Sequence, residues 1–398
     1  MTIALATPYR KIKKQKRRQI MFLRFRNKLY GASALLILVL GVPTFASAGA
    51  KIKVDDTKWF SVGMGFRSSI AVTEDGADNG TGISKNIGTN NMRLYTAAKV
   101  HENITVEYNT EIGSTTATDD KDIRLLDAVV KFNIAGFDFW TGRFLPPSDR
   151  SNLDGPFYLN AFGFPGVAQA YPAIHAGRDN GAAIMKEYNG GQFKFSYGVF
   201  EGRTVNTNAD SNPDQEDNFL HAARATINFW DPEPGYYTTS SYYGAKDVLA
   251  LAFVYQHEDD GAGSNTDALR ADFDAWSIDF LMEKKNQNGS VVNLEGAFYN
   301  YDTDNKADTS ITQGQSYLLL GSYLMPNSIG WGKLQPYVRQ QHFAREAGAD
   351  GGHWRTEGGL NYIIDGQNAK LNATYYVDKN GGGADEKGTF LVGFQFQL

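Results

Sequence analysis

The chain has 398 residues, a mean hydropathy of −0.40 and 21% charged residues, which argues against a membrane protein built from apolar helices. It contains no cysteine, so disulfide frameworks, thiolate metal sites and cysteine nucleophiles are excluded. The formal net charge of −5 falls to −15 once residues 1–48 are removed, because that segment holds ten Lys/Arg and no Asp/Glu. So acidic a chain is a poor match for nucleic acid.

The first predicted element is a secretory signal peptide, residues 1–48. Residues 32–42 are continuously apolar, but about 11 residues are too few for a helix that spans a bilayer, which takes about 20. They follow three basic residues within 24–28 and precede the small-residue stretch 45–48, in the order of a signal peptide. Cleavage is expected after Ala48, with Ala50 as the alternative.

Residues 1–20 extend that signal peptide and carry a basic run from Arg10 to Arg18. One interpretation places the start of translation at Met21, which alone opens a well-proportioned signal peptide. The other treats Arg17 and Arg18 as a twin-arginine export signal. We favour the first, because the twin-arginine route carries folded proteins and a membrane barrel has to reach its membrane unfolded.

Residues 49–398 are predicted to form one all-β domain, a transmembrane antiparallel β-barrel of about 16 strands. From Trp59 onwards apolar and polar residues alternate, as in Phe60 and Val62 against Ser61 and Gly63. Such alternation indicates strands with one face in lipid and the other toward a wet lumen. The strands are expected near 60–67, 92–99, 104–109, 124–133, 137–145, 180–188, 192–201, 218–229, 247–257, 272–284, 290–301, 315–325, 333–344, 354–364, 368–378 and 388–398.

The predicted connections are alternately short and long. Tight turns rich in Gly and Asn follow strands 2, 4, 6, 10 and 14, at 101–103, 135–136, 189–191, 286–289 and 365–367. Longer polar connections lie at 73–90, 204–217, 258–271 and 379–387. Short periplasmic turns and long extracellular loops are typical of outer-membrane barrels. The alternative is a soluble β-sandwich, or several in tandem, but no domain boundary interrupts the strands.

The last nine residues predict the strand that closes the barrel against the segment at Trp59. Its two faces carry apolar residues on one side and Gly or Gln on the other, namely Phe390, Val392, Phe394, Phe396 and Leu398 against Gly393, Gln395 and Gln397. Aromatic residues make up 13% of the chain, and many lie at strand ends where interfacial girdles are expected. These are Trp59, Phe60, Phe229, Trp230, Tyr236, Tyr237, Tyr242, Tyr243 and Trp331. Some of them are expected to pack within the lumen instead.

The longest predicted loop, 146–179, differs from the others in composition. It contains Pro146 and Pro147 and aromatic residues at 157, 158, 162 and 171, which a solvent-exposed loop has little reason to hold. We expect this loop to fold into the barrel, pack on the wall and narrow the pore. The alternative is an external loop that packs on a neighbouring subunit.

Short motifs around this loop resemble the phosphate-selective porin O and P family of Gram-negative outer membranes. They are Gly142-Arg143-Phe144 with Pro146-Pro147 after it, Gly155-Pro156-Phe157-Tyr158, Gly177-Arg178-Asp179-Asn180-Gly181 and Tyr197-Gly198-Val199-Phe200-Glu201-Gly202. The resemblance implies a sixteen-stranded trimeric channel. The chain departs from the family in ending on Leu398 instead of an aromatic residue. It also lacks a clear counterpart of the arginine ladder and lysine cluster associated with phosphate selectivity.

The alternation predicts which charged side chains face the lumen. The basic ones are Arg67, Arg93, Lys99, Lys131, Lys194, Arg224, Arg339, Arg355 and Lys370, and the acidic ones are Glu107, Glu111, Asp127, Asp279, Glu283, Glu295 and Glu357. This near balance predicts no strong anion selectivity. The candidate constriction and pore-lining residues are Arg67, Arg93, Lys99, Lys131, Lys194, Arg224, Arg339, Arg143, Asp149, Arg150, Asp154, His175, Arg178 and Asp179.

Charges of both signs gather near the expected constriction, where Asp149, Asp154 and Asp179 accompany Arg150 and Arg178. Facing groups of opposite sign would create a transverse field that favours small polar solutes. The same groups would equally well form salt bridges that fix the loop to the wall, and the two interpretations are compatible. We expect Arg150 and Arg178 to contribute to anion passage.

The sequence therefore predicts an outer-membrane porin, a water-filled channel for passive diffusion of small hydrophilic solutes or ions, including anions such as phosphate. No cofactor, metal site or enzymatic activity is expected, because the histidines lack paired ligand spacing and no GxSxG or GxxxxGK[ST] pattern occurs. A hydrolase would need a Ser/His pair from different strands, and nothing nominates one. Expected partners are outer-membrane lipid, small solutes or anions and further copies in a homotrimer. The main alternative is a non-conducting outer-membrane scaffold barrel for a secretion or electron-transfer partner.

Overall fold

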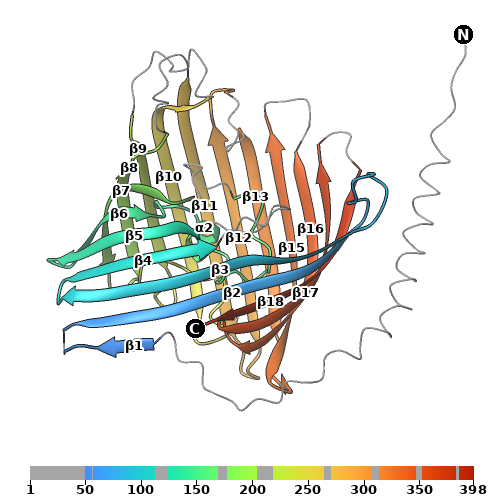
Figure 1. The fold of residues 1–398 in the computed structure, drawn as a ribbon, viewed down its shortest axis with the longest axis horizontal. Helices are drawn as coiled ribbons and strands as arrows, with labels where there is room; N and C mark the ends of the chain where they lie inside the picture. Colours follow the sequence, from blue (N-terminus) through green and yellow to red (C-terminus); the bar gives the residue numbers. More distant parts are fainter. Residues whose placement is uncertain are drawn as a thin grey trace, which may run out of the picture. The chain divides into compact units, whose positions relative to one another are not determined.

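Sixteen antiparallel strands close into a single barrel, as predicted (Figure 1). The computed structural model describes residues 50–55, 57–112, 123–168, 177–203, 218–263, 270–306, 313–346, 352–381 and 385–398, so the predicted signal peptide lies outside the described residues. The wall consists of β2 (Trp59–Thr73), β3 (Ser84–His101), β4 (Ile104–Ile112), β5 (Ile123–Ile134), β6 (Phe137–Phe144), β7 (Asp179–Tyr188), β8 (Phe193–Phe200), β9 (Leu220–Asn228), β10 (Val248–Ala262), β11 (Ala271–Lys285), β12 (Val291–Asp302), β13 (Gly314–Leu324), β15 (Gly332–Arg345), β16 (His353–Asp365), β17 (Ala369–Asn380) and β18 (Lys387–Gln397). Each strand pairs with the next, and β18 returns to β2.

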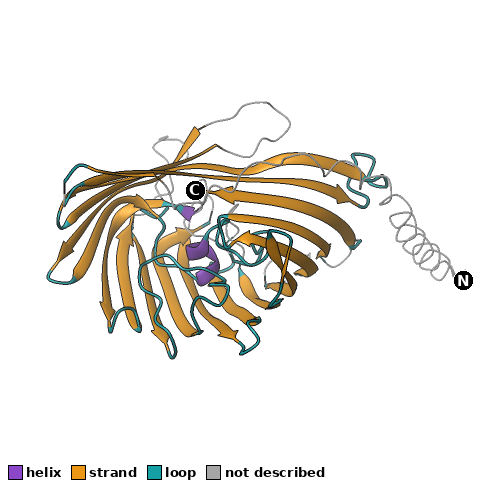
Figure 2. Cartoon of the chain, turned by 90° about the horizontal axis from the view of Figure 1, so that it is seen from below, coloured by secondary structure: helices purple, strands orange, loops and turns teal. Residues whose placement is uncertain are grey.

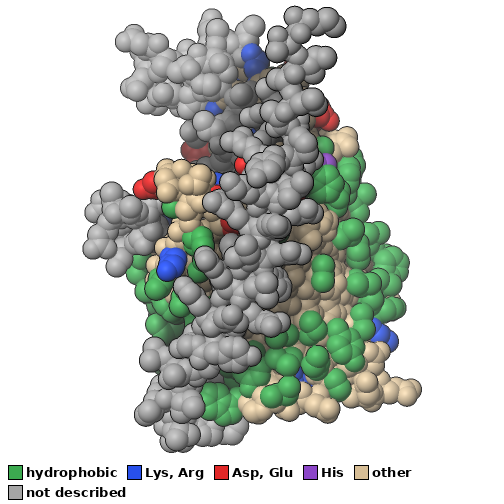
Figure 3. Space-filling model, turned by 90° about the vertical axis from the view of Figure 1, so that its right-hand side faces the viewer, with side chains coloured by type: hydrophobic (Ala, Val, Ile, Leu, Met, Phe, Trp, Pro, Cys, Tyr) green, Lys and Arg blue, Asp and Glu red, His purple; other side chains and the backbone are tan. Residues whose placement is uncertain are grey.

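Buried and exposed side chains alternate along the strands. In β10, Val248, Ala250 and Ala252 are buried, whereas Leu251 and Phe253 are exposed. Figure 3 shows one side of the outer surface, where apolar side chains are spread over the visible wall and charged ones are few. This arrangement follows because the outer face of such a wall meets lipid, while the inner face meets polar loops and water. None of the helices in the described part of the chain has the length and apolar character needed to cross a membrane.

The short turns mark one end of the barrel. They connect β3 with β4, β5 with β6, β7 with β8, β11 with β12 and β16 with β17, as predicted. The first two residues of such turns adopt positive φ, 53° and 73° at Ala135 and Gly136 and 50° and 66° at Asn189 and Gly190. In outer-membrane barrels, short turns of this kind mark the periplasmic end.

Two strands extend farther than the sequence pattern indicates. β3 already begins at Ser84, within the predicted connection 73–90, and β10 runs to Ala262, within the predicted connection 258–271. The added residues are mostly polar, because a strand that has left the lipid no longer needs an apolar outer face. The alternation therefore ends before the hydrogen-bonded ladder does, and the predicted loops were too long.

The closing strand lies as predicted. Gln395 is fully buried and Phe396 is 46% exposed. The Leu398 amide donates to the Met64 carbonyl at 2.8 Å, and the Met64 amide donates to the Leu398 carbonyl at 3.0 Å. The last residue of the chain is thus part of the seam.

Two short strands supplement the wall. β1 (Ala50–Lys53) pairs with the start of β2, from Ala50 opposite Val62 to Lys53 opposite Trp59. Because β18 reaches β2 only from Gly65 onwards, β1 pairs with the part of β2 that β18 leaves free. β14 (Ser328–Ile329) pairs with the start of β15.

Two connections fold into the barrel. The first inward loop, residues 145–168, follows β6 and carries helix α2 (Arg150–Asp154), which Figure 2 shows inside the ring of strands. The second inward loop, residues 229–247, joins β9 to β10 at the end where the other turns are short. Their residues contact each other inside the lumen, and they define the candidate site.

Candidate functional site: two loops inside the lumen

The first inward loop is held by side chains of the wall that donate to its backbone carbonyls. Lys370 Nζ donates to the Leu159 carbonyl at 2.6 Å, and Gln395 Nε2 donates to the Phe157 carbonyl at 2.7 Å. The other donors are Arg67 to Phe162, Arg224 to Ser148, Gln256 to Pro147, Arg339 to Gly163, Asn361 to Asn160, and Ser316 and Tyr301 to Val167. These donors belong to β2, β9, β10, β12, β13 and β15–β18, so the loop is fixed to that part of the wall.

Aromatic side chains of the first inward loop fill space left by glycines of the wall. A Cβ atom on Gly65 would lie 2.7 Å from the ring of Phe157, and one on Gly393 would lie 2.5 Å from the ring of Phe162. Arg67 lies between these rings, with its guanidinium carbon 4.2 Å from the centroid of Phe162. The predicted inward position of these aromatics thus depends on wall residues from both sides of the β2–β18 seam.

Helix α2 begins with a side-chain cap. The Asp149 carboxylate accepts from the amides of Ser151 and Asn152 at 3.0 and 3.4 Å, and from the Tyr299 hydroxyl at 3.0 Å. Burial raises the pKa of Asp149, and the nearby Asp279 adds to this. Asp149 therefore fixes the helix against β12 and is not free to contact a solute.

Arg150 joins the two inward loops. Its guanidinium makes a bidentate ion pair with Glu233 of the second inward loop at 2.6 and 2.9 Å, and donates to the Thr239 carbonyl at 3.0 Å. Arg150 and Glu233 are both 1% exposed. Burial acts to raise the pKa of Glu233, but the Arg150 charge outweighs it and lowers the pKa to about 2. This pair is internal to the protein.

The second inward loop makes further contacts to α2 and to the wall. Asp154 of α2 accepts from the hydroxyls of Thr238 and Ser240, each at 2.6 Å. Glu283 of β11 accepts from the amides of Tyr242 and Gly244 at 2.9 and 2.7 Å. A buried carboxylate on each side therefore holds this loop in the lumen.

Sequence reasoning missed the second inward loop. Tyr236, Tyr237, Tyr242 and Tyr243 were predicted for an interfacial girdle, but the Tyr236 hydroxyl donates to the carbonyl of Leu145 inside the lumen. The Tyr242 hydroxyl likewise donates to Glu233 at 2.8 Å. Tyr236 and Tyr242 therefore follow the alternative of packing within the lumen and not the girdle, because tyrosine suits an interface and a polar lumen equally well. The sequence did offer one sign of an inward loop. The connection 229–247 is much longer than the other turns at the same end of the barrel.

The wall cations predicted to line the pore lie on the lumen side of their strands, and most have a partner. Arg67 donates to Asn91 Oδ1 at 2.9 Å, and Lys194 donates to the Gly235 carbonyl at 3.0 Å. The ion pairs are Arg93 with Glu111 (2.8 Å), Lys131 with Glu107 (2.5 Å), Arg224 with Asp279 (2.5 Å) and Arg339 with Glu357 (2.5 Å). Paired charges of this kind contribute little net field to the lumen.

The remaining candidate residues lie in different environments. Arg178 pairs with Asp127 at 3.3 Å, and Asp179 accepts from the amides of Asn180 and Gly202, each at 2.7 Å. Arg143 lies opposite Ala128, on the other face of β6 from the buried Trp140, so its predicted place in the lumen is corrected to the outer face. Arg143 and Trp140 are an odd number of positions apart, and residues spaced in this way point to opposite faces of a strand. His175 lies outside the described residues.

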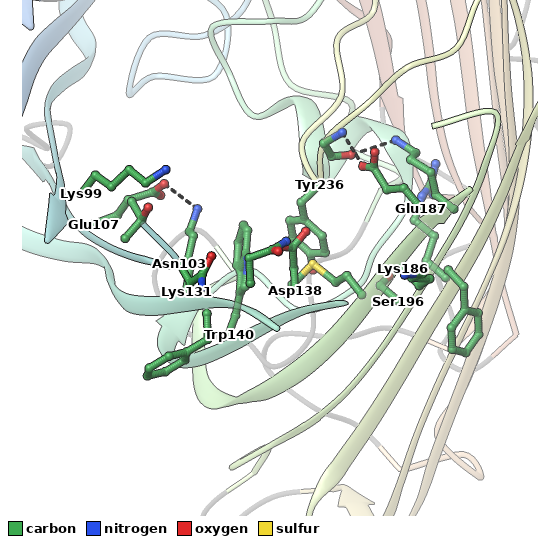
Figure 4. Close-up of a pocket in the computed structure, with 18 of the residues that line it drawn as sticks. Lys99, Asn103, Glu107, Lys131, Asp138, Trp140, Lys186, Glu187, Ser196 and Tyr236 are labelled. Carbon is green, nitrogen blue, oxygen red and sulfur yellow. Dashed lines mark hydrogen bonds and ion pairs between the residues drawn. The ribbon is translucent and has the colours of Figure 1, made fainter. Parts of the chain in front are cut away.

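Two adjoining cavities lie between the β3–β8 part of the wall and the inward loops, which also touch this wall where Tyr236 packs on Trp140 with ring centroids 5.0 Å apart. The smaller cavity has a volume of about 390 Å³ and is lined by Lys99, Lys131, Trp140 and Lys194 among others. Figure 4 shows Lys99 and Glu107 on one side of it and Lys186, Glu187 and Ser196 on the other. The larger cavity, about 930 Å³, lies between β2–β5 and the two inward loops. Trp59 and Glu107 line both cavities.

The contact between Asp154 and the second inward loop should depend on pH. Burial raises the pKa of Asp154 well above its usual range; Arg150 opposes this and Glu295 adds to it. A raised pKa means that the fold binds the proton more tightly than the unfolded chain does, so the buried Asp154 destabilises this region as pH rises through the raised pKa. The hydrogen bonds from Thr238 and Ser240 oppose the shift, because they favour the charged carboxylate. We expect the open-channel current to become noisier as pH rises through that pKa, and Asp154→Asn to reduce the change. Equal profiles for the two proteins would contradict this.

Within the described ranges, no group of three or more His, Asp or Glu side chains is arranged to hold a metal ion. The polar groups of the lumen instead serve to hold loops and to line cavities. The arrangement can admit water and small polar solutes along one side of the barrel.

No protein-family model matches the chain, and no curated protein matches it. Solved structures do resemble it. An anion-selective porin from Comamonas acidovorans aligns with a TM-score of 0.58 at 13% identity, over 86% of this chain and 100% of that one. The trimer form of OmpT, an outer membrane protein of Vibrio cholerae, gives 0.55 at 13% identity over 86% and 100%. The outer membrane channel DcaP of Acinetobacter baumannii gives 0.50 at 12% identity over 88% and 100%. The chain therefore has the fold of outer-membrane porins.

Proposed function

We propose that the chain is an outer-membrane porin through which small hydrophilic solutes and ions diffuse passively. The observation that carries this proposal is the pair of adjoining cavities along the β3–β8 wall, which remain open although the second inward loop touches that wall at Lys194 and Trp140. The apolar outer face suits the outer membrane, to which the predicted signal peptide would direct export. A homotrimer is part of the proposal and is supported by the trimer form of the Vibrio cholerae protein.

The test is conductance in a planar lipid bilayer. Purified protein should insert and give stable, trimer-sized steps of current. The contacts between the two inward loops and the wall are dense enough to suit the alternative as well, a scaffold barrel whose lumen is filled. Insertion without any conductance would therefore favour the scaffold and overturn the porin.

Membership of the phosphate-selective porin family and a preference for anions belong to the proposal. The inward position of the loop within 142–202 supports the first. Lys99 and Lys194 would provide the second, because both line the smaller cavity and neither has an ion-pair partner among the described residues, but Glu102, Asp138 and Glu187 line the same cavity and act against it. Arg150 and Arg178 are paired with Glu233 and Asp127, so the structure favours them as anchors of the loops.

The ion selectivity should follow this division. Replacing Lys99 and Lys194 by Ala should change the anion-to-cation permeability ratio about twofold toward cations, since unpaired charges at a pore mouth set the local ion concentration. The matched variant, Arg150→Ala with Arg178→Ala, should change it much less. Reversal potentials in a salt gradient measure both. A larger shift for the arginine variant would return Arg150 and Arg178 to a role in anion passage.

A further inference from the structure

We propose that the larger cavity is a stacking site for neutral sugars, so that the channel binds ring-shaped, polyhydroxylated solutes on their way through. This inference rests on the proposed porin function and names a solute class for it. It draws on the aromatic lining, the pairing of the charges and the uncharged hydrogen-bonding groups of this one cavity.

Aromatic rings line the larger cavity from opposite sides. Trp59 of β2 and Tyr95 of β3 lie on the wall side, and Tyr158 and Tyr237 come from the first and second inward loops. Tyr158 and Tyr237 are 42% and 38% exposed, unusually open for rings inside a barrel. Tyr95 meets the ring of Phe157, which also lines the cavity, edge to face with ring centroids 6.4 Å apart. The negative face of such rings attracts the C–H faces of a sugar ring, which carry partial positive charge.

Most charged side chains around the larger cavity are paired within the protein, and Lys51 is the exception among the described residues. Arg93 is paired with Glu111 at 2.8 Å and Arg178 with Asp127 at 3.3 Å. Lys51 Nζ lies 4.0 Å from the centroid of the Trp59 ring. An ion that entered this cavity would lose hydration and meet few unpaired opposite charges, whereas a neutral solute does not carry that desolvation cost.

Uncharged polar groups complete the site. Thr239, Ser241, Gln367 and Ser61 line the cavity, and a hydroxyl that already donates keeps lone pairs to accept from a solute. Ser61 Oγ, for example, donates to the Ala97 carbonyl at 3.5 Å. A volume of about 930 Å³ also falls within the range usual for small-molecule sites, about 300–1,000 Å³. Flat apolar faces with polar edges complement a sugar, which has the same two kinds of surface.

The two cavities thus differ in chemistry. The smaller cavity offers Lys99 and Lys194 to anions, while the larger cavity offers rings and hydroxyls to neutral solutes. Variants of the one can therefore serve as controls for the other.

The experiment is the block of the ion current by added solute in a planar bilayer. Glucose should reduce the current of the wild-type channel in a saturable way, whereas sorbitol, a neutral open-chain polyol, should block only at much higher concentration. Tyr158→Ala with Tyr237→Ala should raise the half-blocking glucose concentration about tenfold. The matched variant, Tyr158→Phe with Tyr237→Phe, keeps the ring faces and should change it less than about twofold. Lys99→Ala should leave the glucose block unchanged.

The outcomes separate this inference from the porin proposal. The sugar site is supported if glucose blocks the current in a saturable way, and if this block is lost in the alanine variant and kept in the phenylalanine variant. A channel that conducts but is blocked equally by glucose and sorbitol, or equally in the Ala and Phe variants, overturns the site and leaves the porin standing. Inorganic phosphate that blocks more tightly than glucose and through Tyr158 and Tyr237 would also overturn it. A protein that never conducts overturns both proposals.

Discussion

Replacement of residues 232–246 by a tight Asn-Gly turn should raise the single-channel conductance severalfold. The exchange removes most of the second inward loop, including Tyr237 and Thr238, which line the larger cavity, and Ser240, which donates to Asp154 of α2. The hairpin itself should survive, because the Asp231 amide still donates to the Asp247 carbonyl at 2.9 Å and the new turn continues that register. Arg150→Met belongs in the same protein, since Arg150 would otherwise lose its partner Glu233. Bilayer recordings measure the result.

A matched control shortens another connection at the same end of the barrel. This is the turn at 326–331. Its Trp331 is exposed, and none of its residues lines either cavity. Its replacement by a tight turn should leave the conductance unchanged. Equal conductance for wild type and for the protein that lacks 232–246 would mean that the second inward loop does not narrow the pathway.

Arg150→Met should lower the free energy of unfolding by about 3–5 kcal/mol, because it leaves the Glu233 carboxylate buried without its countercharge. The Glu233 pKa of about 2 in the fold fixes the pH range. A lowered pKa contributes stability that is present above the usual pKa of a glutamate and is lost only as pH falls through about 2. The effect should therefore be complete at neutral pH. Denaturant or heat unfolding of the barrel in detergent measures it.

Two further variants make this prediction specific. Arg150→Met with Glu233→Met removes both charges and should recover much of the lost stability, because no buried charge is left alone. Arg355→Met breaks a pair whose side chains are 21% and 20% exposed, that with Asp378, and should cost about 1 kcal/mol or less. A cost for Arg150→Met no greater than that for Arg355→Met would show that the Arg150–Glu233 pair does not hold the loops.

The barrel itself could be predicted because contact with lipid requires a simple pattern in the sequence. Every strand that crosses needs apolar residues on alternate positions, and the seam between β18 and β2 follows from the last nine residues alone. The prediction of strand ends failed where the strand no longer has to be apolar on one face. Residues 84–90 of β3 lie beyond the lipid, and their backbone pairs with β2 without any apolar pattern.

The candidate site could be predicted only in part, for a different reason. Alternation tells which face of a strand a charge occupies, so Arg93, Arg224 and Arg339 could be placed in the lumen. It does not tell which carboxylate each one meets, because those partners depend on how loops far apart in sequence fold. Arg150 and Glu233 are 83 residues apart, and neither lies on a strand. The lumen is therefore determined by tertiary contacts that a periodic pattern does not encode.

The seam between β18 and β2 has a consequence for assembly. The two threonines that meet there, Thr73 and Thr389, are 316 positions apart, whereas every other junction of the wall joins neighbouring strands of the chain. Loop-closure entropy makes this contact the costliest to form, so both strands should remain open edges until late in folding. Arg67 of β2 and Gln395 of β18 hold carbonyls of the same inward loop. That loop can thus gather the two edges before they pair, which gives it a part in building the barrel as well as in narrowing it.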